Sequence, residues 1–421
     1  MNSDPFGRLP WFALQSILSN LPSLPALYSL YNASPEVAAF LHWNKDLFAQ
    51  IIDAIISNPV CERGLAPHVQ DILRLIIRIW TPIQEPDTDI LGSLYYVLER
   101  PHVLPPMRET RSQFYVESRP RESPPTLKAI SPSTPSAILS RLLRLMGRLR
   151  CLIHAYFHSA ITRCLQLQLE HIPPPLRRRK RWWTADWVVD RSKRPKGIPY
   201  TPTDIGPLTW VEEQRLLSSF LFIVLFHELH KTHLEHSLFI KDSESVRALL
   251  ENDVEGFWKN ALREYHSTEG HEEQLVALLH WLGQQAGRPE NIYQWLLSGH
   301  VSEDYSHCCQ CYTTVIHTQM KEVEIKCNDL REGISSRGVQ SLRSCRRDLR
   351  SPLKGVDRSV FHPYGLVFWD GVRLNGLGFL GKCCPDLTWF SWSSIFTEED
   401  WEDLQRRQST ITTFGDVLHR L

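Results

Sequence analysis

The chain has 421 residues and a formal net charge of zero, with 47 basic and 47 acidic side chains. This balance excludes a global electrostatic attraction to nucleic acid or to an anionic membrane. The length allows two or three domains, or one large helical body. Ten cysteines in a chain of this size do not resemble the framework of a small secreted protein, so we expect mostly reduced thiols.

We expect neither export nor membrane insertion. Asp4, Pro5, Arg8 and Pro10 interrupt the apolar core that a signal peptide would need. The longest apolar run, residues 220–226, is far shorter than the ~18 residues of a membrane span. These features predict a protein of the cytosol, the nucleus or both, without a membrane partner.

Residues 9–56 predict a compact unit of short apolar helices. Ser34, followed by Pro35 and Glu36, is typical of a helix start, because the hydroxyl caps free amides and proline tolerates the first turn. A unit of about 40 residues rarely buries its own apolar surface, so we expect the rest of the chain or another protein to cover it. The apolar residues recur at the spacing of one helical face in Leu14, Ile17, Leu18 and Leu21, and again in Leu24, Leu27 and either Leu30 or Tyr31.

This arrangement resembles the F-box, the trihelical module by which substrate receptors dock on the Skp adaptor of SCF-type ubiquitin ligases. Ala33-Ser34 stands where that family often has Val-Ser or Val-Cys, and Trp11 and Phe12 stand where it often has an acid. More narrowly, the chain is similar to divergent F-box-like proteins of filamentous fungi, both here and in "PLTWVEEQRLL" at 207–217. The matching residues are Leu9-Pro10, Ile17-Leu18, Leu21-Pro22, Leu24 and Leu27.

The resemblance implies a substrate receptor that binds the Skp adaptor through its N-terminal module and a protein client through the remaining helical body. Such a receptor contributes proximity and not catalysis. The alternative is a non-catalytic helical interaction or regulatory protein, without a ubiquitin-ligase role, whose N-terminal module packs intramolecularly. The adaptor-binding residues that the resemblance implies are Leu9, Pro10, Leu14, Ile17, Leu18, Leu21, Leu24 and Leu27.

The remaining sequence predicts a mainly α protein. We expect a helical extension over 57–103, a Pro/Ser-rich linker or loop over 104–136, and a helical C-terminal region over 137–421. That region opens with a core helix from Ile138 to about Ile172. A basic loop over 173–206 follows it.

Beyond the basic loop, the pattern again indicates helices. Thr209 with Glu212, and Thr397 with Asp400, have the spacing of helix caps. Around Asp370-Gly371, β-rich residues predict a small hairpin at 364–375, although a short helix also fits. Further helices are expected at 246–265, 272–285 and 289–297.

Two clusters of metal-binding residue types have simpler explanations. His227, His230, His233 and His236 recur every three residues, whereas a zinc-protease helix needs histidines four apart, so we expect a polar helix end. Cys308 and Cys311 have zinc-knuckle spacing but lack a second tight pair, so we expect reduced thiols and leave zinc open. No phosphate-binding loop or nucleophile motif occurs, and we expect a protein that is not an enzyme, without metal or cofactor.

The basic segment is the clearest electrostatic feature of this neutral chain. Its two clusters fit a nuclear-import signal or a solvated loop anchored by neighbouring tryptophans. We do not expect nucleic-acid binding, since that normally recruits a larger basic surface. The import candidates are Arg177, Arg178, Arg179, Lys180, Arg181, Arg191, Lys193, Arg194 and Lys196.

Overall fold

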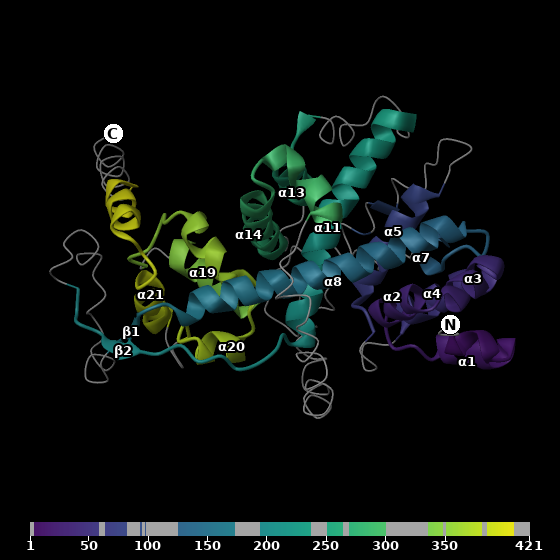
Figure 1. The fold of residues 1–421 in the computed structure, drawn as a ribbon. Coiled ribbons are helices and arrows are strands. Elements are labelled where there is room, and N and C mark those ends of the chain that lie inside the picture. The colour runs from purple at the N-terminus through teal and green to yellow at the C-terminus, as the bar shows by residue number, and fades with distance from the viewer. Residues whose placement is uncertain are drawn as a thin grey trace, which may run out of the picture. The chain divides into compact units, whose positions relative to one another are not determined.

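The computed structural model of the protein is mainly α, as the sequence predicts (Figure 1). Its contacts divide the chain into two compact units. Unit 1 comprises 1–155, 209–275 and 286–334, and unit 2 comprises 156–208, 276–285 and 335–421. The structure describes residues 4–58, 64–81, 93, 94, 97, 125–172, 194–236, 251–263, 269–299, 336–347, 351–380 and 385–407.

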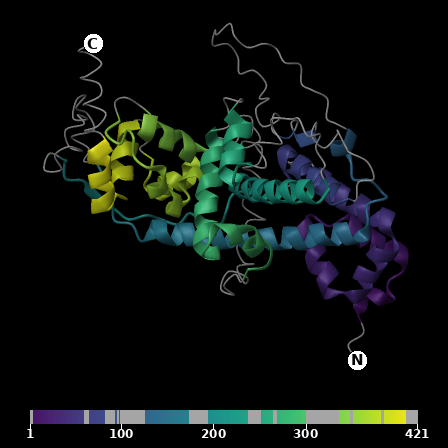
Figure 2. The same ribbon diagram turned by 90° about the horizontal axis from the view of Figure 1, so that it is seen from above.

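Unit 1 begins with a cluster of short helices, called here the N-terminal module (Figure 2). Ser34 caps α3 as predicted, because its Oγ accepts the Val37 amide at 3.1 Å. The module has four helices where three were expected, since α4 packs against α1, α2 and α3. A 3-10 turn, η1 (Pro5–Arg8), precedes α1 (Trp11–Ser19), α2 (Leu24–Ala33), α3 (Pro35–Trp43) and α4 (Lys45–Ser57).

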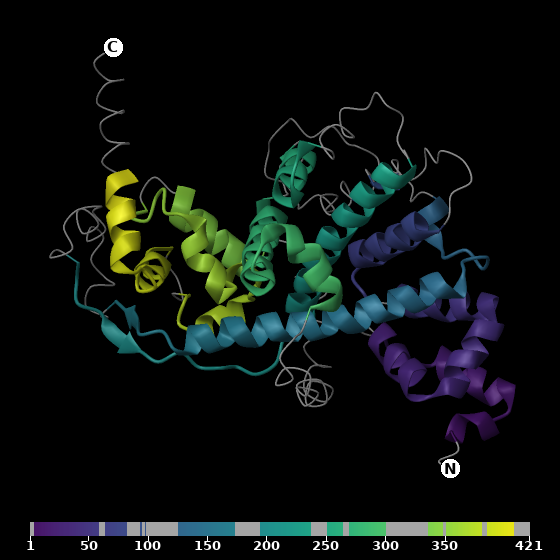
Figure 3. The ribbon, with the colours of Figure 1, turned by 45° about the horizontal axis from the view of Figure 1, so that its top comes forward.

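The rest of unit 1 is built around α5 and α11, which lie side by side (Figure 3). The predicted capping box at the start of α11 is confirmed: the Thr209 amide donates to Glu212 Oε2 at 3.0 Å, and the Glu212 amide donates to Thr209 Oγ1 at 3.2 Å. The elements are α5 (Pro67–Trp80), α7 (Pro125–Lys128), α8 (Ser136–Leu165), α11 (Trp210–His236), α13 (Val254–Arg263), α14 (Glu269–Ala286), η5 (Pro289–Asn291) and α15 (Ile292–Ser298). Helices α8 and α14 contribute residues to both units.

Unit 2 has an aromatic core beside a two-stranded sheet. Trp369, Trp389 and Trp392 are each no more than 1% exposed. The strands pair antiparallel, with Leu169 opposite Tyr200 and His171 opposite Ile198. The elements are β1 (Leu169–His171), β2 (Ile198–Tyr200), α19 (Arg337–Arg347), η7 (Arg358–Tyr364), η8 (Leu366–Phe368), α20 (Gly371–Gly376), α21 (Pro385–Ser393) and a helix at 398–407.

The structure differs from the sequence prediction in three segments. The helix expected to reach Ile172 ends at Leu165, because the following residues pair with β2. At 364–375 the hairpin prediction is wrong and the alternative of a short helix is confirmed, since the segment forms the helical turns η8 and α20. Four consecutive residues, 366–369, are buried, which does not match the alternation of a strand. The end of the predicted linker is folded, since Leu127 and Ile130 are buried.

Candidate docking surface and pocket

Helix α1 carries both buried and exposed apolar side chains. Leu14 and Leu18, one turn apart, are 4% and 0% exposed and belong to the core of the module. Trp11 and Phe12 are 67% and 61% exposed, and their rings lie edge to face with centroids 6.3 Å apart. Large exposed aromatic side chains that lie together are typical of protein interfaces.

The predicted adaptor-binding residues fall into three groups. Leu9, Pro10 and Ile17 are exposed, and Leu21 is half-buried. The other four have their side chains in the core of the module and are not accessible to a partner: Leu14, Leu18, Leu24 and Leu27. We use the name α1 surface for the exposed residues in and just before α1, namely Leu9, Pro10, Trp11, Phe12 and Ile17. The apolar stripe predicted for α1 therefore contains both buried and exposed residues. Trp11 and Phe12 were not predicted as contact residues.

A hydrogen-bond cluster holds η1 against the start of α3. Asp4 Oδ2 accepts the Ser34 hydroxyl at 2.5 Å and the Glu36 amide at 3.2 Å, while Oδ1 accepts the Phe6 amide at 3.0 Å. These bonds, chiefly the one from Ser34, lower the pKa of the Asp4 carboxyl below its ordinary value. The chain ahead of α1 is thereby tied to the module that carries the α1 surface.

The opposite side of the module is bonded to α8. Tyr31 on α2 places its hydroxyl 2.7 Å from His42 Nε2 and 3.2 Å from Ser140 Oγ. His42 Nδ1 lies 3.0 Å from Ser136 Oγ at the start of α8. Tyr28 packs against Gly147, where a Cβ would lie 2.4 Å from the tyrosine ring. The chain therefore covers this side of the module itself.

A buried arginine attaches α4 to its neighbours. The Arg74 side chain on α5 is 7% exposed and lies 3.1 Å from Asp53 Oδ1 on α4. Its guanidinium also donates to Ser57 Oγ at 2.5 Å and to the Leu127 carbonyl at 3.2 Å. This pair anchors the module to the remainder of unit 1.

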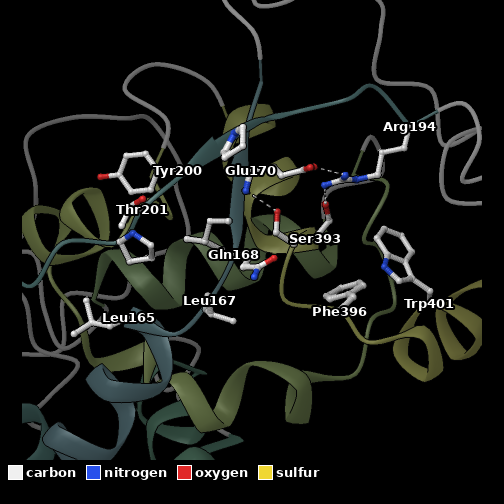
Figure 4. Close-up of a pocket in the computed structure, with 14 residues that line it drawn as sticks. Leu165, Leu167, Gln168, Glu170, Arg194, Tyr200, Thr201, Ser393, Phe396 and Trp401 are labelled. Carbon is white, nitrogen blue, oxygen red and sulfur yellow. Dashed lines mark hydrogen bonds and ion pairs between the residues drawn. The ribbon is translucent and has the colours of Figure 1, made fainter.

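Unit 2 contains a pocket of about 420 Å³ between the end of α8, the two strands and the segment after α21 (Figure 4). Leu165 and Leu167 line one wall, and Phe396 and Trp401 line another. The two aromatic rings lie 5.0 Å apart, centroid to centroid. Its size falls within the range of small-ligand and side-chain sites.

An ion pair forms the polar wall of this pocket. Glu170 Oε2 lies 2.5 Å from Arg194 Nη1, and the guanidinium carbon of Arg194 lies 4.3 Å from the centre of the Phe390 ring. Arg194 Nη2 also approaches Ser393 Oγ at 3.5 Å. Gly197 packs closely here, since a Cβ would lie 2.5 Å from Glu170 Cβ. The wall is therefore held in place before any ligand binds.

The pocket changes the interpretation of the basic segment. Arg194, one of the import candidates, has its guanidinium bonded to Glu170 and stacked on Phe390, which makes it a structural residue. Lys196 is exposed. The remaining seven candidates, 177–181, 191 and 193, lie outside the described residues, so the import hypothesis stays a prediction on those positions.

The histidine cluster on α11 contains a buried carboxylate. Glu228, 2% exposed, accepts bonds from Arg141 and from the Tyr293 hydroxyl. The His227 ring stacks on Tyr293 with centroids 4.5 Å apart, and burial lowers the pKa of His227 to about 4. Within the described part of the chain, no three His, Cys, Asp or Glu side chains come together as metal ligands.

The cysteines give no further site within the described ranges. Cys308, Cys309 and Cys311, the residues with zinc-knuckle spacing, lie outside them. Cys345 is buried in α19, and burial raises the pKa of its thiol well above the ordinary value. Such a thiol is not a ready metal ligand, because the thiolate is the form that binds metal.

Comparisons of the chain with protein-family models, characterised proteins and solved structures found no match. Among the described helices, none combines the length and the apolar character that crossing a bilayer requires.

Proposed function

We propose that this protein is an F-box-like substrate receptor whose α1 surface binds the Skp adaptor of an SCF-type ubiquitin ligase. The observation that carries the proposal is the exposure of Trp11 and Phe12, whose rings lie together at the start of α1. Burying two such aromatic side chains against a partner removes several hundred Å² of apolar surface from water. The remaining helical body, in the cytosol or nucleus, binds a protein client and performs no chemistry itself.

Co-purification with the host's Skp adaptor tests the docking proposal. We expect the wild-type chain to form a complex, and Trp11→Ser combined with Phe12→Ser to weaken it by at least tenfold, as loss of an aromatic hot spot does. Trp43→Ser is the matched control, because Trp43 is 86% exposed but lies on α3, outside the α1 surface. Failure of the folded wild-type chain to bind the adaptor would overturn the proposal.

Substitution of Leu18 would not serve this experiment. Its side chain is 0% exposed, so a charge there would disrupt the module before any partner is tested. Substitutions at exposed positions change adaptor binding without disrupting the fold, so they test docking alone.

A second candidate function is a helical interaction protein without a ubiquitin-ligase role. The observation in its favour is that α8 bonds to the module at Tyr31 and His42, and that Arg74 of α5 pairs with Asp53 of the module. In that case the folded chain would not bind the adaptor. Deletion of residues 1–56 would destabilise unit 1, because it removes these hydrogen bonds and the ion pair.

A further inference from the structure

We propose that the pocket in unit 2 binds a basic side chain, lysine or arginine, presented by a peptide segment of another protein. The inference goes beyond adaptor docking and does not depend on it, because the pocket belongs wholly to unit 2. It rests on two observations: the Arg194 charge is already paired with Glu170, and apolar side chains form the walls around this pair.

Arg194 is not available to an incoming anion. Its side chain is 19% exposed, pairs with Glu170 and has its guanidinium carbon 4.3 Å from the centre of the Phe390 ring. An anionic ligand that reached this guanidinium would also have to lie next to the Glu170 carboxylate, which would repel it. The pocket therefore does not favour acidic ligands.

Glu170 keeps an acceptor available. Only Oε2 of its carboxylate bonds to Arg194, and Oε1 has no hydrogen-bond partner among the residues that the structure describes. The side chain is 33% exposed and lines the pocket. A carboxylate commonly accepts bonds from two cationic groups at once, since its two oxygens offer about four lone-pair sites. A second guanidinium or ammonium group, from a ligand, could donate a hydrogen bond to Oε1 of Glu170.

The apolar walls of the pocket favour a cationic group that is carried on a hydrocarbon stem. Leu165 and Leu167 face a pocket whose other wall is the edge-to-face pair of Phe396 and Trp401. Aliphatic stems pack on such surfaces, and aromatic rings also attract a cation. A charged head on a hydrocarbon stem matches both walls, whereas a small inorganic cation would leave the apolar surface unfilled. The volume of about 420 Å³ leaves room for adjoining peptide backbone.

Calorimetric titration of the full chain with blocked tripeptides tests the proposal. The probes are acetyl-Ala-Arg-Ala-amide, its lysine analogue and its citrulline analogue, which keeps the shape of arginine but carries no charge. We expect saturable binding of the arginine and lysine peptides and at least tenfold weaker binding of the citrulline peptide. Equal affinity for arginine and citrulline peptides, or no saturable binding of either basic peptide, would overturn the assignment.

Charge changes at the rim locate the binding. Gln168 is exposed and lines the pocket, whereas Gln166 is exposed two residues away and does not line it. Gln168→Lys should weaken the arginine peptide about fivefold and Gln168→Glu should strengthen it by a similar factor, because the added charge lies near the bound cation. Gln166→Lys should change the affinity little. Equal effects of the two lysine substitutions would refute this location, and adaptor binding is measured in a separate assay.

Discussion

In the N-terminal module, α2 and α3 carry polar side chains that bond to α8, whereas α1 presents two aromatic rings to solvent. Both sides belong to one small group of helices with a shared core. The covered side uses hydrogen bonds whose partners are fixed in the same chain, and the exposed side uses apolar surface that has no such partner among the described residues. The contrast indicates which side is available to another protein.

The largest expected effect separates the inner and outer faces of α1. Leu18→Asp should destabilise the module by about 4 kcal/mol or more, because the substitution removes a buried side chain and places an unpaired charge in the core. Ile17→Asp, at the neighbouring position, should cost less than about 1 kcal/mol, since Ile17 is 39% exposed.

Hydrogen exchange of the α1–α4 amides, followed in urea, would measure both effects within the full chain. Similar losses of protection for the two variants would contradict the assignment of an inner and an outer face.

A smaller effect is expected on the covered side. Tyr31→Phe removes the hydroxyl that bonds to His42 and lies close to Ser140, and should cost about 1 kcal/mol. Tyr28→Phe is the matched control, since no hydrogen bond of the Tyr28 hydroxyl occurs among the described residues, and it should be nearly neutral. Chemical unfolding of both variants checks the difference, and equal costs would show that the bonds to α8 contribute nothing.

The smallest expected effect concerns the exposed carboxyl of Asp4. Its hydrogen bonds lower its pKa in the folded chain, so the ionised form stabilises the fold. This contribution is fully present above the pKa of the unfolded state, ~3.9, and is lost as the pH falls through the lower folded value. Exchange rates of the Ser34 and Val37 amides should rise over that acidic range in the wild type. Asp4→Asn should remove the pH dependence, and its persistence in that variant would assign it to another group.

Local sequence patterns predicted the helix starts well. Ser34 with Pro35, and Thr209 with Glu212, form the expected caps because capping depends on residues only three apart. Thr397 likewise meets Asp400, with the Thr397 amide 2.9 Å from Asp400 Oδ2. Such signals need no tertiary context.

Features that depend on distant segments were not predictable in the same way. Which side of α1 faces inward depends on where α4 lies, and a helical stripe of apolar residues does not encode it. The pocket brings together Glu170, Arg194 and Trp401 from three separated segments. No spacing pattern in the sequence marks these residues as neighbours, so only the fold identifies the site.

The pairing of β1 with β2 has a consequence for the chain entropy of unit 2. Leu169–His171 and Ile198–Tyr200 meet as neighbours, so the residues between them form a closed loop. The entropic cost of closing a loop grows only with the logarithm of its length, and each doubling adds about 0.6 kcal/mol. Unit 2 should therefore tolerate a longer connection between the two strands, and a reporter domain inserted between residues 172 and 194 should leave the strand pairing intact.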